Sequence, residues 1–505
     1  MPGIVAAGHQ ETASAAAEVL KSGGNAFDAA IAAFWTACVV EPALTSPAGG
    51  GFLLARPAGE SSRLYDFFVQ TPQSKRASQE LHFFEVSANF GKVTQDFHIG
   101  MGSVATPGNT MGMFKVHSDL GSMPMSELVG FAAQLARDGF AIDPFQSFVL
   151  DVIHPIYLAS PGARRIFASE QRDGHTKQPG EHIANPEFAD FLEQLARDGY
   201  PFFYEGELAE EMDRMSRHSG GHLSKTDLSD YQVIVRDPLT HHIGKSLLTT
   251  NPLPSSGGAL IAFGMSCVKP LLSGQIFGST EHLTALAETM AATELARKFA
   301  SHDLHRLLDP VAIQAFRDQV HSRAASFKGT THISIADGFG NLASVTTSNG
   351  EGSGDLIPGC GFMFNNMLGE EDLNPMGFHN WTVNQRMTSM MAPSFVDTPN
   401  QTIVLGSGGS NRIRTAILQV LVNLLEYDMS IEEAVCAPRL HYEKEKLDIE
   451  PGLSGTQNLI ARYKNHFCWP QQNLFFGGTH AVVTAGHSFS GAGDPRRNGV
   501  VITIP

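Results

Sequence analysis

The chain has 505 residues, of which 42% are hydrophobic and 17% are charged, so it holds enough apolar material for a large core and too little charge for a disordered protein. Its 35 Lys and Arg residues against 51 Asp and Glu residues give a formal net charge of −16. That balance argues against nucleic acid and against an anionic membrane as partners, and no apolar stretch reaches the roughly 20 residues that a transmembrane helix requires.

The first residues of the chain and its cysteines bear on the cellular location of the protein. Residues 1–7 contain no basic region followed by an apolar stretch, so no signal peptide is visible. The five cysteines are widely scattered and form no CxxC pair, so the sequence predicts no disulfide framework. We therefore expect a cytoplasmic protein with reduced thiols; a truncated start that hides an export signal is the alternative.

Two helices and a strand are expected in the first part of the chain. Residues 11–22 have apolar side chains near helical spacing, and Gly23-Gly24 ends the pattern. Residues 26–40 are apolar on nearly every side, which is typical of a helix buried in the middle of a fold. The triplet Gly49-Gly50-Gly51 then precedes an apolar strand over residues 52–55, where glycines allow close packing of the backbone.

The middle of the chain, residues 120–240, is predicted to be mostly helical. The clearest segments are residues 125–138 and 187–197, whose apolar side chains recur on one face. Asn185 is suited to cap the second of these helices. A further helix is expected over residues 281–299.

A polar and charged stretch from about residue 302 to 329 is expected to be exposed, and the pattern changes after it. Residues 331–336 alternate like a half-buried strand, residues 337–341 supply turn chemistry, and residues 342–347 return as a second strand. This spacing predicts an antiparallel hairpin.

Strands and helices alternate in the last part of the chain. The strand 403–405 ends in the glycine-rich turn 406–410, a helix is expected over residues 413–427, and strands follow at 481–484 and 500–504. Long helices that flank several antiparallel hairpins favour layers of helix packed on sheet.

Familiar hydrolase signatures are absent from the sequence. It contains no GxSxG elbow, no HExxH motif and no Cys/His cluster with the spacing of a zinc site. A nucleophile has to be sought elsewhere in the chain.

Thr330 stands at the start of the predicted hairpin, directly after the charged stretch. If the Gly329–Thr330 bond were cut, Thr330 would carry a free α-amine, whose ordinary pKa of about 8 lets it act as general base for the hydroxyl of the same residue. The alternative is that Thr330 and Thr331 are ordinary strand residues, because β-branched side chains suit strands.

Nine short motifs decide between these interpretations, because together they resemble the γ-glutamyltranspeptidase family of N-terminal-nucleophile hydrolases. They occur in the family's order from one end of the chain to the other: Gly23-Gly24-Asn25-Ala26-Phe27-Asp28-Ala29-Ala30, Gly49-Gly50-Gly51-Phe52, Thr106-Pro107-Gly108, Pro254-Ser255-Ser256-Gly257-Gly258, Thr330-Thr331-His332-Ile333-Ser334, Gly340-Asn341, Gly406-Ser407-Gly408-Gly409-Ser410, Ala437-Pro438-Arg439 and Asp494-Pro495-Arg496.

The resemblance implies an α+β fold, the four-layer αββα sandwich of the N-terminal-nucleophile hydrolases. It also implies that autocleavage yields a large fragment, residues 1–329, and a small fragment, residues 330–505. The two fragments would stay associated as one intertwined domain.

The resemblance further implies a role for individual residues of the reaction centre. Thr330 matches the nucleophile, and Ser348 falls where the family has a threonine hydroxyl that supports it. Gly408 and Gly409 match the glycine pair whose backbone N–H groups form the oxyanion hole, a role that suits residues without side chains. Asn349 matches a substrate-contacting asparagine, although one residue is missing before it.

The acyl-binding residues match the family less well. Thr388 and Ser389 match a hydroxyl pair that helps hold the glutamyl α-carboxylate. Glu370 stands where the family has an aspartate that binds the α-amine, and Met367 replaces a glutamine.

The family also pairs the α-carboxylate with an arginine that precedes a proline by four residues. Counted back from Pro72, Phe68 stands in that position. Arg76 lies nearby in sequence, but as part of a Lys-Arg pair it is better explained as a solvated residue.

The sequence therefore predicts a γ-glutamyl hydrolase or transferase that acts on glutathione and related γ-glutamyl amides through a threonine acyl-enzyme, with water or an amine as acceptor. This chemistry requires no cofactor and no metal. An amidase of the same fold with another acyl specificity, similar to cephalosporin acylase, is the first alternative, and an uncleaved, non-catalytic binding protein is the second. A homo-oligomer stays open.

Overall fold

The computed structural model describes residues 1–89, 94–299, 308, 329–374 and 376–505. The stretch 302–329, expected to be exposed, falls almost entirely outside the described residues. No helix in the described part of the chain combines the length and the apolar character needed to cross a bilayer.

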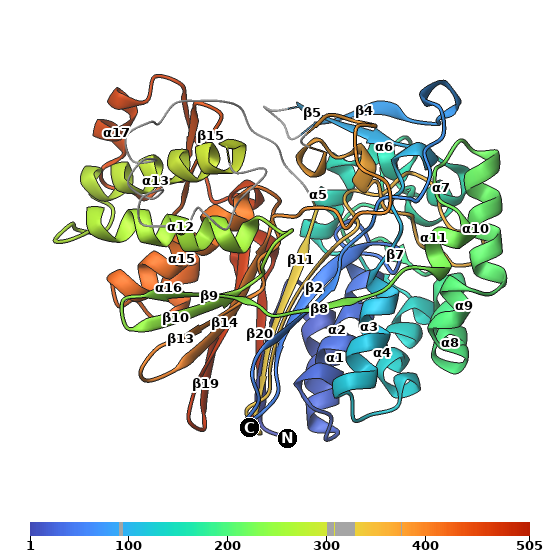
Figure 1. Cartoon of the computed structure of the whole chain (residues 1–505), viewed down its shortest axis with the longest axis horizontal. Coiled ribbons are helices and arrows are strands. Elements are labelled where there is room, and N and C mark those ends of the chain that lie inside the picture. Colours follow the sequence, from blue (N-terminus) through green and yellow to red (C-terminus); the bar gives the residue numbers. More distant parts are fainter. Residues whose placement is uncertain (90–93, 300–307, 309–328, 375) are drawn as a thin grey trace.

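Two antiparallel β-sheets face each other in the middle of the molecule, and helices cover the outer face of each (Figure 1). Within the described residues, the first sheet has seven strands in the spatial order β20 (Val500–Ile504), β1 (Gly3–Ala7), β11 (Thr331–Asp337), β12 (Leu342–Ser348), β2 (Gly50–Arg56), β3 (Arg63–Phe67) and β8 (Ile234–Arg236). The second has six, in the order β19 (Ser488–Ala492), β18 (Gly478–Ala485), β14 (Thr402–Gly408), β13 (Ser394–Asp397), β10 (Ser246–Thr250) and β9 (Leu239–Ile243).

Helices from the first half of the chain lie on the outer side of the first sheet, and helices from the second half lie on the outer side of the other; some pack on the strands and others on these helices (Figure 1). The first group is α1 (Gln10–Lys21), α2 (Ala26–Val40), α3 (Asn109–Leu120), α4 (Met125–Asp138) and α8 (Pro186–Asp198). The second group is α12 (Gly257–Val268), α13 (Thr280–Phe299), α15 (Arg412–Glu426) and α16 (Ile431–Cys436). The molecule is thus the predicted four-layer αββα sandwich, and the predicted helices and strands agree with these elements to within a few residues.

Smaller elements complete the periphery. They are the strand pairs β4–β5 (Phe84–Asn89, Thr94–Ile99) and β6–β7 (Phe140–Ala141, His182–Ile183), the strands β15–β17 (Leu440–Glu443, Lys446–Ile449, His466–Cys468), and the helices α5 (Pro144–Val152), α6 (His154–Tyr157), α7 (Pro161–Phe167), α9 (Tyr200–Tyr204), α10 (Glu207–His218), α11 (Lys225–Ser229) and α17 (Thr456–Arg462).

Helix α2 shows how local sequence produces this packing. The Asn25 side chain accepts the backbone N–H groups of Phe27 and Asp28, and the Asp28 carboxylate accepts the N–H of Asn25, which closes a capping box. Every residue of the helix is buried, as its uniformly apolar sequence predicts. It packs against β11 and β12 and so fixes the strands that carry Thr330 and Ser348.

The strand β11 differs from its prediction. All seven of its residues are buried, so the prediction of a half-buried strand was wrong. Ile333 and Ile335 point into the core under α2, while Ser334 on the other face donates a hydrogen bond to the His480 carbonyl of the second sheet. The polar half of the alternation faces another sheet rather than solvent.

Candidate active site

Thr330 lies at the start of β11, between the two sheets, and its residue is only 3% exposed. Its hydroxyl donates a hydrogen bond to the Gly329 carbonyl oxygen at 2.7 Å. The Gly329 N–H donates to Glu351 Oε1 at 3.0 Å. Gly329, the residue before the predicted cut, is therefore hydrogen-bonded through both its carbonyl oxygen and its N–H in the uncleaved chain.

Ser348 reaches the same peptide group from the neighbouring strand. Thr347 pairs with Thr331 across the β11–β12 ladder, which brings the next residue, Ser348, level with the start of β11. Its hydroxyl donates to the Gly329 carbonyl at 2.6 Å and accepts the Gly350 N–H at 2.9 Å. The hydroxyls of Thr330 and Ser348 thus converge on one carbonyl oxygen.

The glycine pair arrives from the opposite sheet, because β11 packs directly on β14. A Cβ atom added to Gly408 would lie 2.2 Å from the Thr330 carbonyl oxygen, so only glycine fits there. Gly409 has a φ of +115°, which L-residues with side chains rarely adopt. The predicted nucleophile therefore lies in direct contact with Gly408, the first residue of the predicted glycine pair.

Arg497 is a further residue of this centre that the sequence analysis missed. It is buried, and its Nη1 atom donates to the Thr330 carbonyl oxygen at 3.1 Å. Burial lowers the pKa of its guanidinium to about 10, although the nearby Asp494 and Glu41 act to raise it. Its position directly after the motif Asp494-Pro495-Arg496 is a signal that could have drawn attention to it.

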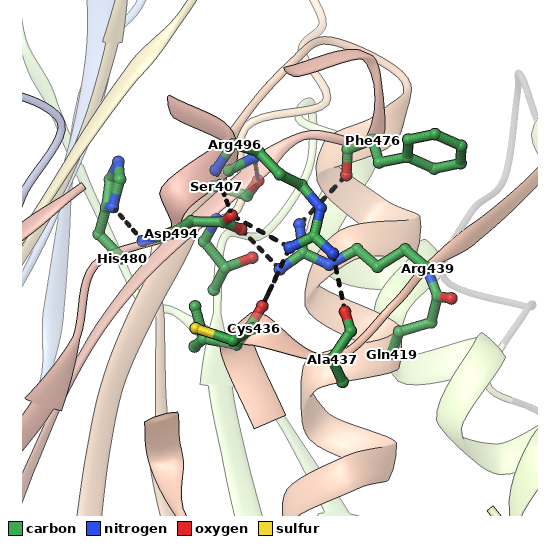
Figure 2. A network of polar contacts seen from close by, with 12 residues as sticks. Ser407, Gln419, Cys436, Ala437, Arg439, Phe476, His480, Asp494 and Arg496 are labelled. Atoms are coloured by element: carbon green, nitrogen blue, oxygen red, sulfur yellow. Dashed lines mark hydrogen bonds and ion pairs between the residues drawn. The ribbon is translucent and has the colours of Figure 1, made fainter. Parts of the chain in front are cut away.

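A buried ion-pair network holds the turn that carries Arg497 (Figure 2). The side chains of Arg439 and Arg496 converge on the Asp494 carboxylate, at 2.6 and 3.1 Å, and Arg496 also pairs with Glu450. Burial alone would raise the pKa of Asp494, but the two guanidinium groups lower it to about 2. Two of the nine sequence motifs, around Arg439 and around Asp494, are explained by this network.

A pocket opens beside Thr330 and contains several of the predicted site residues. Thr330 and Ser348, predicted for catalysis, line it together with Gly329, the residue before the predicted cut, and Glu370, predicted to bind substrate. Ser389 also lines it, as predicted for a substrate-binding hydroxyl. Phe68, Met367, Asp372, Leu373, Met390, Met391, Ser410 and Ile413 complete the described lining.

The loop that carries Ser389 is held by the motif Pro254-Ser255-Ser256. The hydroxyl of Ser255 donates to the Ser389 carbonyl at 2.9 Å, and the Ser256 N–H donates to it at 2.8 Å. The motif therefore positions the Ser389 loop at the pocket.

Two predicted substrate-binding residues do not line this pocket in the described structure. The Asn349 side-chain amide donates to the Phe364 carbonyl at 3.3 Å, and the Thr388 hydroxyl donates to the Pro254 carbonyl at 2.8 Å. Arg76 also lies elsewhere, since its guanidinium donates to the Arg217 carbonyl.

Comparison with known proteins identifies the family to which the chain belongs. The sequence model of the γ-glutamyltranspeptidase family matches residues 12–504. The chain belongs to this family. It is an enzyme of the N-terminal-nucleophile hydrolase type.

Two curated relatives within the family are equally similar to the chain. The acylase ACY 1 proenzyme of Pseudomonas sp. strain V22 is 29% identical over 484 residues, covering 91% of this chain and 86% of the relative. The glutathione hydrolase proenzyme of Pseudomonas aeruginosa is 29% identical over 543 residues, covering 99% of this chain and 94% of the relative.

The crystal structure of cephalosporin acylase from Bacillus halodurans superimposes with a TM-score of 0.86, covering 99% of this chain and 95% of the other. The identity is 22%, so this likeness bears on the fold alone. The chain is thus similar both to proteins named acylases and to a protein named a glutathione hydrolase.

Proposed function

We propose that this member of the γ-glutamyltranspeptidase family is a γ-glutamyl hydrolase or transferase that works through a Thr330 acyl-enzyme and is activated by cleavage of its own Gly329–Thr330 bond. The observation that carries the proposal is the convergence of the Thr330 and Ser348 hydroxyls on the Gly329 carbonyl. The relatives named proenzymes support an inactive precursor.

Autocleavage begins when Thr330 Oγ1 attacks the Gly329 carbonyl carbon. The Gly329 oxygen then carries the negative charge of the tetrahedral intermediate, and the Ser348 hydroxyl at 2.6 Å is placed to stabilise it. The C–N bond breaks, the Thr330 nitrogen takes up a proton, and an ester joins Gly329 to Oγ1. Water hydrolyses this ester and releases fragments 1–329 and 330–505, which remain packed together because β11 and β12 of the small fragment lie between β1 and β2 of the large one.

Turnover repeats the same chemistry on an external amide. The free α-amine of Thr330 takes the hydroxyl proton as Oγ1 attacks the γ-carbonyl of the substrate. The backbone N–H groups of Gly408 and Gly409 stabilise the oxyanion, with about 3 kcal/mol expected for each donor. The amine leaves with the proton, and water or a second amine then releases the γ-glutamyl group. Ser389 and Glu370 are proposed as substrate-binding residues, and their position in the lining of the pocket supports this. Asn349 and Thr388, which do not line the pocket, stay predictions from the resemblance.

The test is the pair of variants Thr330→Ala and Thr330→Ser. The wild-type protein is expected to show two bands on a denaturing gel in place of one at 54.4 kDa, and to release p-nitroaniline from γ-glutamyl-p-nitroanilide. Thr330→Ala removes the nucleophile and should abolish both, while Thr330→Ser keeps a hydroxyl and should retain both. Two fragments in the Thr330→Ala protein would overturn autocleavage by Thr330.

An acylase with another acyl group is the second candidate, because one of the two relatives named above is an acylase and because Phe68 lines the pocket where the resemblance implies an arginine. Faster cleavage of glutaryl-p-nitroanilide than of γ-glutamyl-p-nitroanilide would favour this candidate. A stable single band in the wild-type protein would instead favour an uncleaved binding protein.

A further inference from the structure

Arg497 is a buried cation that is only partly hydrogen-bonded. It is 3% exposed, and its pKa of about 10 leaves it charged at neutral pH. Its Nη1 atom donates to the Thr330 carbonyl oxygen at 3.1 Å, but in the described part of the chain its buried Nε and Nη2 atoms have no hydrogen-bond partner. A buried guanidinium with unpaired donors destabilises a fold, so such a residue is a candidate for a functional role.

Three glycines make room for this side chain. A Cβ atom added to Gly408 would lie 3.0 Å from Arg497 Nη1, and one added to Gly409 would lie 3.2 Å from Nη2. At Gly478, the first residue of β18, an added Cβ atom would clash with Arg497 Cδ. The guanidinium is therefore held beside the glycine pair, in contact with the carbonyl of the proposed nucleophile.

Cleavage before Thr330 would create an amine close to this guanidinium. The α-nitrogen and the carbonyl oxygen of one residue are at most about 3.6 Å apart, because both are bonded to the same short N–Cα–C unit. The amine would therefore lie within about 7 Å of Arg497 Nη1. Thr330 is only 3% exposed, so the like charge of the guanidinium and the burial would both favour the neutral amine over the ammonium.

We propose that Arg497 is a positioning residue for acyl transfer, which holds the Thr330 carbonyl and keeps the α-amine freed by cleavage in the neutral form that accepts the hydroxyl proton. The proposal rests on the function proposed above and adds a residue to it. An amine with the ordinary pKa of about 8 would be about 90% protonated at neutral pH, and so mostly unable to act as a base. A neighbouring group that stays positively charged shifts this balance toward the free amine.

Glu41, directly after α2, is a carboxyl group that opposes Arg497 at the nucleophile. Its Oε1 atom accepts the Thr331 hydroxyl at 3.2 Å, one residue from Thr330. Burial raises the pKa of Glu41, with Asp143 adding to the rise and His9 opposing it. A carboxyl group that is harder to ionise offsets less of the charge of the guanidinium.

Further charged groups come from the turn that carries Arg497 and from α15. Asp494 lies on the turn, but its carboxylate is already paired with Arg439 at 2.6 Å and with Arg496 at 3.1 Å. Arg412 of α15 is a second cation near Arg497 and acts to lower its pKa. The positive charge at this point is therefore not cancelled by Asp494 alone.

The last titratable groups lie in β18 and around the pocket. His480 of β18 has a pKa of about 4, so it is neutral at neutral pH. The remaining carboxyl groups near Thr330 are those of Glu351, Glu370 and Asp372. All of these groups are the same in the wild type and in a variant of Arg497, so a difference between the two proteins reports on the guanidinium.

Periodate measures the state of the α-amine without any turnover of substrate. It oxidises an N-terminal threonine through the neutral amine, and the oxidised 330–505 fragment loses mass. The pH dependence of this rate in the purified, cleaved protein therefore gives the pKa of the Thr330 amine. The acid limb of kcat/KM for γ-glutamyl-p-nitroanilide gives a second, independent value.

Three variants separate the charge of Arg497 from its hydrogen bond. Arg497→Gln removes the charge but keeps a side-chain N–H donor, Arg497→Lys keeps the charge, and Arg165→Met removes the charge of an arginine on α7 whose side chain is 62% exposed. We expect the amine pKa of the wild type to lie about 1 unit or more below the ordinary 8, and that of Arg497→Gln to be about 1 unit higher than wild type. Arg497→Lys and Arg165→Met should stay within about 0.3 units of wild type.

The activity should follow the same shift. Because the amine acts as a base only when neutral, a higher pKa moves the acid limb of kcat/KM to higher pH. Arg497→Gln should therefore lose about tenfold in kcat/KM at about pH 6, and less at higher pH. A loss that is equal at every pH, with no shift of the acid limb, would show a purely structural role and would contradict the proposal.

Two results of the periodate titration would overturn the proposal. One is the same amine pKa in the wild type and in Arg497→Gln. The other is a wild-type amine pKa of about 8 or above, which is decisive even if Arg497→Gln does not fold or is not cleaved.

The two measurements also distinguish failure of this proposal from failure of the proposed function. If the protein is cleaved but hydrolyses no γ-glutamyl anilide, the function is wrong, and a higher amine pKa in Arg497→Gln still supports the role of Arg497. If the anilide is hydrolysed and the amine titration does not change, the function holds and the role of Arg497 is wrong. A chain that is never cut between Gly329 and Thr330 forms no α-amine there and contradicts both.

Discussion

The reaction centre and the acyl pocket touch at Thr330 but are built from different parts of the chain. The centre is made at strand ends by backbone groups and hydroxyls: Thr330 before β11, Ser348 at the end of β12 and Gly408 at the end of β14. The pocket wall is made largely by side chains on loops and short turns, such as Phe68 after β3 and Met367 in the turn Met367–Gly369. Strand register fixes the first set, whereas the second set can change without disturbing the sheets.

This difference bears on the two kinds of relative, which are named an acylase and a glutathione hydrolase. Because the proposed centre depends largely on the positions of backbone atoms, many side chains around it can change while it is kept. In the proposed function, recognition of the acyl group depends on a few side chains, among them Phe68, which stands where the resemblance to the family implies an arginine. Substitutions at the proposed reaction centre should therefore almost always reduce activity, whereas many substitutions in the pocket wall should be tolerated.

Gly408→Ala is the severest test of the centre. The new Cβ would lie 2.2 Å from the Thr330 carbonyl oxygen, so β14 or Thr330 must move and the oxyanion donors must move with it. We expect kcat/KM to fall by about 10³-fold or more. Gly130→Ala in the exposed face of α4 is the control, because nothing lies within 4 Å of its Cβ, and it should leave activity unchanged. Activity of Gly408→Ala within a few-fold of wild type would contradict the close approach.

Ser348→Ala tests whether the Ser348 hydroxyl is needed for autocleavage, as distinct from being needed for a stable fold. It removes the hydroxyl that donates to the Gly329 carbonyl at 2.6 Å, so the developing oxyanion of autocleavage loses a donor. We expect the appearance of fragments, followed on gels over time, to slow by about 10²-fold. Ser348→Thr restores a hydroxyl and should process normally. Ser353→Ala, in the following loop, should also process at the wild-type rate, and a delay there as large as in Ser348→Ala would point to a general loss of stability.

Low pH should reduce the free energy of unfolding through protonation of His480. This residue lies in β18 opposite Gly406 of β14, the strand that ends at Gly408. Burial lowers its pKa from 6.5 to about 4, with Arg497 and Arg439 adding to the effect and Asp494 opposing it. The unfolded chain therefore binds more protons between these pH values, so stability is complete above about pH 6.5 and is lost as the pH falls toward about 4. The gap between the two pKa values corresponds to about 3 kcal/mol.

Urea unfolding at about pH 7 and at about pH 4.5 measures this loss. The variant His480→Gln should show a smaller difference between the two pH values than the wild type. An equal difference would assign the acid sensitivity to other groups.

The same division between centre and pocket explains what the sequence could predict. The nucleophile, the glycine pair and the four-layer fold were predicted from the resemblance of the motifs to the family, and the periodicity is compatible with that fold. The burial of β11 on both faces could not be read from its alternation, since a polar residue that faces another sheet looks like one that faces water. Arg497 was missed because its contact with Thr330 joins residues 167 positions apart. The side chains of Asn349 and Thr388 point to the carbonyls of Phe364 and Pro254, orientations that sequence spacing does not specify.

Met367→Leu is the mildest test and addresses the pocket side of the comparison. Leu has nearly the volume of Met and, like it, buries no polar group, so we expect a stability cost below about 1.5 kcal/mol and a change in kcat/KM below about threefold. Met367→Gln instead places an amide at a position where the native residue is only 1% exposed. An unpaired polar group buried there should lower the free energy of unfolding by about 1–3 kcal/mol. Thermal unfolding and anilide kinetics of the two variants measure both effects. If Met367→Leu lowered activity as much as Gly408→Ala does, the pocket wall would be as intolerant as the reaction centre, and recognition could not have diverged independently of the chemistry.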